Sequence, residues 1–250
     1  MTVPIDQAPT ALLDRVHTVL GAFEDAGALT LSQVVTRTGL PRSSTHRILD
    51  QLVRLRWIHR TGRDYTLGLR LLELGVSAVR QDRLHEAAVP VMARLHQATR
   101  AVVHLGILDG DDVMILHREA GPLRLAVPTR VGGRYPAVRT ALGRVLLAGR
   151  DGRPAGDGPG LPVVAAARIR ERGIARTVVD RTDGADGAAC VAVPIGTAET
   201  ATAALSLCLP ARAGRLDPRM EAPLREAAGR IRRALDAPAN PDAARRGAGR

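Results

Sequence analysis

The sequence predicts an α+β protein in two parts: a small helical part that ends in a β-hairpin, and a larger part that mixes helices with antiparallel strands. In roughly the first 70 residues, three runs carry apolar side chains at helical spacing, and two short alternating segments follow them. Beyond about residue 82, helical runs alternate with strand-like runs. An apolar stretch connects the two parts.

The first two helices are indicated by their apolar spacing and by the residues at their ends. A helix over about residues 10–26 is expected from the apolar positions Leu12, Leu13, Val16, Val19, Leu20 and Phe23. A shorter helix is expected after Thr30, because Thr30 followed by Gln33 is the pattern of a capping box. Gly39 suits the left-handed position that ends this second helix.

A third helix and a hairpin complete the small part. Pro41 suits the first turn of this helix, which is expected to run to about Arg54 with an apolar face of Ile48, Leu49, Leu52 and Leu55. Residues 57–60 and 64–67 are predicted to form two short strands around a Thr-Gly turn. Three small helices followed by a hairpin are typical of a winged helix-turn-helix, which we assign to residues 1–67.

Residues 68–81 are predicted to form a linker helix. Their apolar side chains cover more than one helical face, and they are Leu69, Leu71, Leu72, Leu74, Val76 and Val79. Because a helix that is apolar nearly all round does not remain in water, we expect this one to be buried and to take part in a dimer contact.

The larger part, residues 82–237, is predicted to be a mixed α/β domain. Helices are expected at 82–99, at 138–149, shortly before residue 174 and from Asp217 onward, and strands at 101–108, 112–118, 174–179, 189–195 and 201–209. The turn Asp109-Gly110-Asp111 joins the first two strands. Residues 238–250 are expected to be a disordered tail, because they are rich in Ala, Pro, Gly and Arg.

The charge of the chain points to a polyanionic partner. The formal net charge is +11, and all 36 basic residues are arginine, a choice that also reflects the codon bias of a GC-rich genome. Seven arginines and one acid, Asp50, lie between residues 37 and 63. The positive charge is therefore concentrated on the third helix and the hairpin, beyond what a uniform bias produces.

The third helix carries side chains that suit contact with double-stranded DNA. A helical wheel places Ser43, His46 and Arg47 opposite the apolar face, whereas Thr45 turns inward. Short donors and arginines near a helix start are suited to phosphates and to base edges in the major groove. The predicted DNA-contact residues are Arg42, Ser43, Ser44, His46, Arg47 and Arg54 on the helix, with Arg60 and Arg63 on the hairpin.

The cysteines and the hydropathy suggest an intracellular protein. Cys190 and Cys208 lie far apart inside apolar runs, so no disulfide framework and no zinc site are expected. The N-terminus has no signal-peptide pattern, and no apolar stretch reaches about 18 residues, so no membrane partner is expected. We therefore expect a cytoplasmic location.

Several spaced motifs resemble the IclR family of bacterial transcriptional regulators. In the small part and the linker they are Leu31–Val35, Gly39–Leu49, Tyr65–Gly68 and Leu71–Gly75. In the larger part they are Arg134–Ala137, Ala141–Ala148, Arg172–Gly173, Cys190–Pro194 and Ala203–Ser206. The resemblance implies a GAF-like mixed α/β effector-binding domain, a small-molecule effector, and a homo-oligomer that is a dimer or a dimer of dimers.

The resemblance also implies where the effector binds. In the family the effector lies against the start of the helix that begins here at Ala141, and free N–H groups at a helix start favour a carboxylate. The residues carried over or adjacent are Arg124, Val127, Arg139, Thr140, Ala141, Leu142, Asp180, Cys190, Ser206 and Cys208. Together with Leu205, they predict a pocket for a small organic anion with a hydrophobic body.

This sequence departs from the family pattern at Cys208 and Leu209, and its stretch between Cys190 and Ser206 is one residue short. Cys208 stands where a second serine is common, and Leu209 stands where glycine is usual. These changes make the pocket less polar or shift its wall. An alternative role for Cys190 and Cys208 is that of small buried hydrophobic side chains. The alternative for Asp180 is a solvated carboxylate in a loop.

Two other functions were weighed against a ligand-responsive regulator. An enzyme needs a nucleophile, a base and an orienting group that converge, but the histidines are scattered, and no catalytic or nucleotide-binding motif is present. No catalytic residue, metal site or cofactor is therefore predicted. An architectural DNA-binding protein without a ligand stays possible, and ligand-dependent thermal stabilisation distinguishes it from a sensor.

Overall fold

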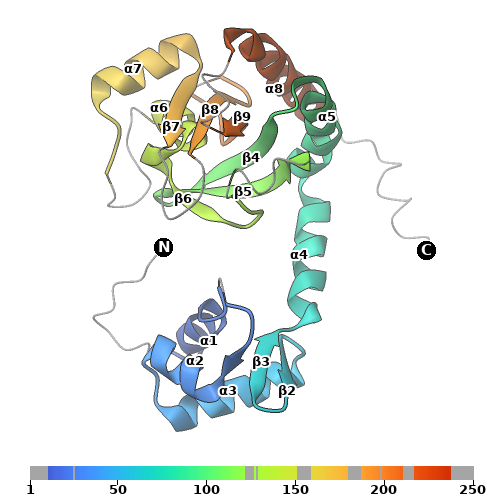
Figure 1. Cartoon of the computed structure of the whole chain (residues 1–250), viewed down its shortest axis with the longest axis vertical. Coiled ribbons are helices and arrows are strands. Elements are labelled where there is room, and N and C mark those ends of the chain that lie inside the picture. Colours follow the sequence, from blue (N-terminus) through green and yellow to red (C-terminus); the bar gives the residue numbers. More distant parts are fainter. Residues whose placement is uncertain are drawn as a thin grey trace, which may run out of the picture. The chain divides into compact units, whose positions relative to one another are not determined.

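The computed structural model describes residues 11–24, 26–121, 127, 129–150, 159–179, 187–197, 199–210 and 217–237 of the chain. The described residues form two compact units (Figure 1), the first ending at Gln81 and the second beginning at Asp82. The predicted tail, 238–250, lies outside the described residues.

The first unit is a winged helix-turn-helix, as the sequence predicts. Its helices are α1 (Leu12–Gly21), α2 (Leu31–Thr38), α3 (Arg42–Arg54) and α4 (Leu69–Gln81). Its antiparallel sheet has the order β1-β3-β2, with β1 (Leu29–Thr30), β2 (Ile58–Thr61) and β3 (Asp64–Leu67). Buried apolar residues from three helices and the hairpin form its core, among them Val19, Phe23, Val34, Leu49, Ile58 and Tyr65.

The ends of α2 form as the sequence indicates. The Thr30 side chain accepts a hydrogen bond from the N–H of Gln33 (3.4 Å), and the Gln33 side chain accepts one from the N–H of Thr30 (2.8 Å). Gly39 ends the helix with φ at 67°, a conformation that costs glycine little. The first helix is shorter than expected, because residues beyond Gly21 turn back toward the core. Leu55, placed on the buried face by periodicity, is 59% exposed just beyond the end of α3.

The prediction that the linker helix is buried is wrong for the single chain. The apolar side chains of α4 are exposed in it, with Leu69 at 71% and Leu72 at 62%. Leu74, Val76 and Val79 are also exposed. The apolar side chains around α4 therefore form an exposed surface that has no partner within the described residues of one chain.

The second unit contains a six-stranded antiparallel sheet with the order β6-β5-β4-β9-β8-β7. The strands are β4 (Val102–Asp109), β5 (Asp112–Glu119), β6 (Arg134–Pro136), β7 (Ala175–Val179), β8 (Ala188–Pro194) and β9 (Ala203–Pro210). The helices are α5 (Arg83–Thr99), α6 (Ala141–Ala148), α7 (Val163–Arg172) and α8 (Glu221–Asp236). Short 3-10 turns precede α6 and α8.

Alternation along the strands gives the sheet two different faces. Leu205 and Leu207 of β9 pack with α5 and α8, together with Met92, Val191, Val193 and Ile231. The alternate residues along the same strands, Ala204 of β9 and Ala192 of β8, pack against α6 on the other face. Leu205 therefore belongs to the core beneath α5 and α8, not to the effector pocket for which the sequence suggested it.

Candidate nucleic-acid interface and ligand pocket

Helix α3 presents one polar face to solvent. Thr45, Ile48, Leu49 and Leu52 are buried, and the Thr45 hydroxyl donates to the carbonyl of Pro41 (3.2 Å). The opposite face exposes Arg42, Ser43, His46, Arg47 and Arg54, with Ser44 half-buried. Pro41 provides no side-chain cap, so the first-turn N–H groups of α3 are suited to a phosphate.

Three of the predicted DNA-contact side chains are already oriented by neighbours. Arg42 donates to the Ser32 hydroxyl of α2 (3.0 Å), and His46 Nδ1 lies 3.1 Å from a carboxylate oxygen of Asp50. On the wing, Arg60 donates to the carbonyl of Gly62 (3.1 Å) and stacks over the ring of Tyr65. Arg63 is exposed at the same turn. Reading periodicity alone did not identify Ser32, which orients Arg42 from the preceding helix.

A pocket of about 390 Å³ in the second unit brings together the predicted effector-contact residues that the structure describes, with the exception of Leu205. These residues are Val127, Arg139, Thr140, Ala141, Leu142, Cys190, Ser206 and Cys208. Arg124 and Asp180 lie outside the described residues. The pocket also contains residues that were not predicted, including His104, Thr129, Tyr135 and Thr177.

The strand register explains why these side chains meet. Thr177 of β7 pairs with Cys190 of β8, and Cys190 pairs with Cys208 of β9. In the neighbouring row, Ser206 of β9 pairs with His104 of β4. Because residues two apart on a strand share a face, both rows lie on the face that α6 covers and form the floor of the pocket.

The start of α6 forms a polar end of the pocket, close to the positive charge of Arg139. Thr140 caps the helix by accepting from the N–H of Gly143 (2.9 Å), and the N–H groups of Ala141 and Leu142 belong to the same first turn. A Cβ at Gly143 would lie 2.2 Å from the carbonyl oxygen of Ala137, so the helix packs tightly on the 3-10 turn that carries Arg139. Arg139 is exposed, and this places positive charge at the pocket.

His104 is the buried titratable group of the pocket floor. It is 2% exposed, its Nε2 lies 2.7 Å from the Thr129 hydroxyl, and its Nδ1 lies 3.5 Å from the Ser206 hydroxyl. Burial, with a smaller contribution from the charge of Arg118, lowers the pKa of His104 to about 3. The imidazole is therefore neutral near pH 7 and offers a hydrogen bond without a charge. In the sequence, His104 lies between the apolar core residues Val103 and Leu105 of β4. This position in an alternating strand was the signal that could have identified His104.

Thr177 provides a second polar group on the floor. It is 9% exposed, and among the described residues its hydroxyl has no hydrogen-bond partner. Val178, the next residue, is 67% exposed, so β7 alternates between pocket and solvent. A buried hydroxyl without a partner costs stability, which a polar ligand group can restore.

The expectation that the two cysteines form no disulfide is wrong. Cys190 and Cys208 are joined by a disulfide across β8 and β9, and their Cα atoms are 4.2 Å apart. They are 18 residues apart in the sequence, and only the register of the two strands places them directly opposite one another. The disulfide is part of the pocket floor.

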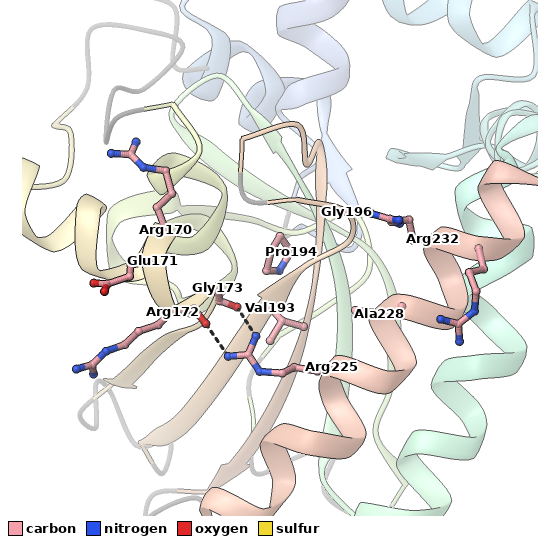
Figure 2. A pocket seen from close by; sticks show the side chains of 12 residues that line it. Arg170, Glu171, Arg172, Gly173, Val193, Pro194, Gly196, Arg225, Ala228 and Arg232 are labelled. Atoms are coloured by element: carbon pink, nitrogen blue, oxygen red, sulfur yellow. Dashed lines mark hydrogen bonds between the residues drawn. The ribbon is translucent and has the colours of Figure 1, made fainter.

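A larger groove of about 520 Å³ lies between the end of α7, the end of β8 and α8, and it contains none of the predicted residues. Its arginines hold the helix ends: Arg225 donates to the carbonyls of Arg172 (2.6 Å) and Gly173 (3.3 Å), as Figure 2 shows. Arg170 donates to the carbonyl of Ala148, and Arg232 lies 3.6 Å from Asp236. These guanidinium groups serve the packing of α7 and α8, so the smaller pocket is the better candidate for a ligand.

Comparison with known proteins matches both units. The model of the IclR helix-turn-helix domain matches residues 12–62, and the model of the bacterial transcriptional regulator IclR C-terminal domain matches residues 76–154. In the described part of the chain, no helix is long and apolar enough to cross a membrane.

Curated relatives are similar over part of their length. The Pca regulon regulatory protein of Pseudomonas putida is 35% identical over 141 residues, which are 56% of this chain and 48% of that protein. The regulator KdgR of Escherichia coli is 30% identical over 59% of this chain and 57% of its own length. The chain thus aligns with about half the length of these two relatives.

A solved structure is similar over the full length of its chain. It is an IclR homolog from Microbacterium hydrocarbonoxydans complexed with 4-hydroxybenzoate, with 30% identity and a TM-score of 0.74. The similarity covers 91% of this chain and 100% of that one.

Proposed function

This chain belongs to the IclR family of bacterial transcriptional regulators, and from that premise we propose that a small hydroxylated organic acid in the pocket beside α6 modulates its binding to an operator. As a member of this family it is a DNA-binding regulator with an effector domain, and not an enzyme. The observation that carries the proposal is that residues predicted from the family resemblance come together in one pocket.

The acid is proposed because the two ends of the pocket differ in charge. Arg139 and the first-turn N–H groups of Ala141 and Leu142 favour a carboxylate at one end. At the floor, His104 is neutral near pH 7, so it does not attract an anion. Apolar side chains between the two ends, such as Val113 and Ile115, suit a hydrophobic body.

The hydroxyl is proposed because the floor presents neutral polar groups. The Thr177 hydroxyl has no partner in the described residues, and His104 and Ser206 lie in the next row. A ligand hydroxyl both donates and accepts, so it can satisfy groups of either kind. The relative from Microbacterium hydrocarbonoxydans was crystallised with 4-hydroxybenzoate, which has this combination of carboxylate, ring and hydroxyl. Arg124 and Asp180 stay predicted contacts.

Calorimetry with three matched compounds tests the proposed ligand class. We expect 4-hydroxybenzoate to bind more tightly than benzoate, because benzoate leaves the Thr177 hydroxyl unsatisfied. We expect 4-hydroxybenzamide to bind more weakly than 4-hydroxybenzoate, because the amide has no charge for Arg139 to attract. Tighter binding of the amide than of its parent acid would contradict the proposal.

For the DNA surface, we propose that α3 enters the major groove and that the wing contacts the backbone. Ser43, His46 and Arg47 are exposed near the start of α3, where they suit base edges. Arg42 and Ser44 on the first turn are proposed to contact base edges or phosphates. Arg54, Arg60 and Arg63 are proposed to contact phosphates. The proposed domain bounds are 1–67 for DNA binding, 68–81 for the linker and 82–237 for the effector.

We propose that the exposed apolar face of α4 packs against a second copy of the chain. Leu69 and Leu72 are exposed in the single chain, and burial of such side chains stabilises a dimer. A two-fold dimer, or a dimer of dimers, presents two α3 helices to a near-palindromic operator. Sedimentation should show an oligomer at micromolar concentration, and a monomer with Leu69→Glu and Leu72→Glu together. A monomeric wild-type protein would refute this assembly.

A further inference from the structure

The disulfide lies in the pocket floor and joins β8 and β9, two of the strands that form it. Cys190 is half-buried and lines the pocket, whereas Cys208 is 4% exposed. On one side Cys190 pairs with Thr177, and the Cys208 sulfur lies 3.9 Å from the Ser206 hydroxyl. The sulfur atoms therefore lie between the polar groups to which a ligand hydroxyl would bind.

We infer that Cys190 and Cys208 form a reversible thiol–disulfide site whose redox state sets the affinity of the pocket for its ligand. The inference rests on the proposed function, since it describes regulation of the same pocket. It is based on the directly opposed register of the two residues and on their shared place in the pocket floor. The site responds to a small or protein dithiol that acts as reductant.

The chemistry is exchange between a dithiol and the disulfide. A thiolate of the dithiol attacks the sulfur of Cys190, the half-buried cysteine that lines the pocket, and the bond between the two cysteine sulfurs breaks. Cys208 leaves as a thiolate and takes up a proton. The second thiol of the reductant then attacks the mixed disulfide and releases Cys190, which also takes up a proton. Two electrons and two protons pass to the protein, and the dithiol becomes a disulfide.

Reduction changes the shape and polarity of the pocket floor. Bonded sulfurs lie about 2 Å apart, whereas non-bonded heavy atoms stay roughly 3.5–4 Å apart. Cys208 is enclosed by the core, so the Cys190 side chain has to turn toward the pocket. The new S–H groups also compete for the hydroxyl groups of Thr177 and Ser206. Both effects lower the affinity for a ligand that binds there.

The coupling has to be reciprocal. If reduction weakens ligand binding by a given factor, the ligand opposes reduction by the same factor. A ligand in the pocket also blocks the path to the Cys190 sulfur. The ligand is therefore expected to slow reduction as well as to shift its equilibrium.

The test uses the full chain in buffers of oxidised or reduced dithiothreitol, with 4-hydroxybenzoate as the probe. Trapping with iodoacetamide and mass spectrometry count the free thiols, and calorimetry measures the dissociation constant in each state. We expect the disulfide in the oxidised buffer, two free thiols in the reduced buffer, and a dissociation constant at least about fivefold larger after reduction. The probe should shift the reduction equilibrium by the same factor.

Matched variants separate the disulfide from other effects of the reductant. The double change Cys190→Ser and Cys208→Ser should bind the probe equally in both buffers. Val178→Ala, on the exposed side of the neighbouring strand, should keep the full response to reduction. A double variant that still responds to dithiothreitol would overturn the inference.

Two further outcomes, both measured on the wild-type protein, test the inference. Equal affinities in states whose thiol content has been verified would overturn it, as would absence of the disulfide in the oxidised buffer. If the probe binds neither state, the proposed acid effector is wrong, and hydrogen exchange decides the redox inference separately. Exchange in residues 188–194 and 203–210 must then increase on reduction, and unchanged exchange would refute it.

Discussion

The backbone of Gly68 lies against the carbonyl oxygen of Arg56, so that a Cβ at residue 68 would be 2.2 Å from that oxygen. The Gly68 N–H also donates to the carbonyl of Trp57 (2.7 Å). Within the first unit, Arg56 and Arg70 both pair with Glu73 of α4. These contacts fix the first turn of α4 to the chain just beyond the C-terminal end of α3, where Arg56 itself has φ at 61°.

Gly68→Ala should therefore displace α4 from the winged helix. We expect a lower melting temperature and weaker operator binding, because backbone atoms have to move to admit the methyl group. Gly75→Ala is the matched control, since no atom lies within 4 Å of a Cβ there. The control should instead stabilise α4 by about 0.5–1 kcal/mol. Equal melting temperatures for the two variants would show that the contact between Gly68 and Arg56 is dispensable.

The double change Ser43→Ala and Arg47→Ala should abolish sequence-specific DNA binding and leave the fold intact. Both side chains are exposed near the start of α3, so their removal creates no cavity. Each base-edge contact is worth about 1–3 kcal/mol, so two losses are visible in a gel shift. Arg168→Ala, an exposed charge on α7, controls for the loss of one positive charge. If the double variant still discriminated between sequences as well as wild type, α3 would not be the reading helix.

Neutralising Arg60 and Arg63 together should weaken binding to all DNA sequences alike. Both residues flank the turn of the hairpin, where they suit phosphates. The slope of log affinity against log salt should become less steep by about two units at most. A changed base preference at an unchanged slope would assign sequence reading to these residues.

Stability should fall in acid because of His104. Its pKa is about 3 in the folded protein against 6.5 unperturbed, so the unfolded chain binds the proton first as the pH falls. The loss begins near pH 6.5, is complete near pH 3, and amounts to about 3 kcal/mol at pH 4. His104→Gln, which stays neutral, should lose that much less between pH 7.5 and pH 4 in urea unfolding. Parallel pH curves for the two proteins would contradict the assigned cause.

Local signals in the sequence predicted most helices and the exposed polar face of α3. The capping box at Thr30 and Gln33 and the left-handed Gly39 depend on residues within a few positions of each other, so they can be read directly. The resemblance to the family located the start of α6 and most of the pocket. The strands β1 and β6 were missed because Leu29–Thr30 and Arg134–Pro136 are too short to show alternation.

The parts that the sequence did not predict depend on long-range pairing. Cys190 meets Cys208, and His104 meets Ser206, only through the register of strands that are distant in the chain. His104 and Ser206 are 102 residues apart. Thr177 is an ordinary strand residue until the burial of its hydroxyl is known. The exposure of α4 was missed because apolar periodicity does not distinguish a core from a surface that another copy covers.

The most direct test of the account measures DNA binding and ligand together. The protein first selects a preferred DNA from a random pool, and fluorescence anisotropy then gives its affinity with and without 4-hydroxybenzoate. The account predicts that the acid changes the affinity of the wild-type protein, and that Arg139→Ala requires a higher acid concentration for the same change. Selection of a preferred sequence whose affinity responds to none of a panel of organic acids would contradict it, and would leave an architectural DNA-binding protein.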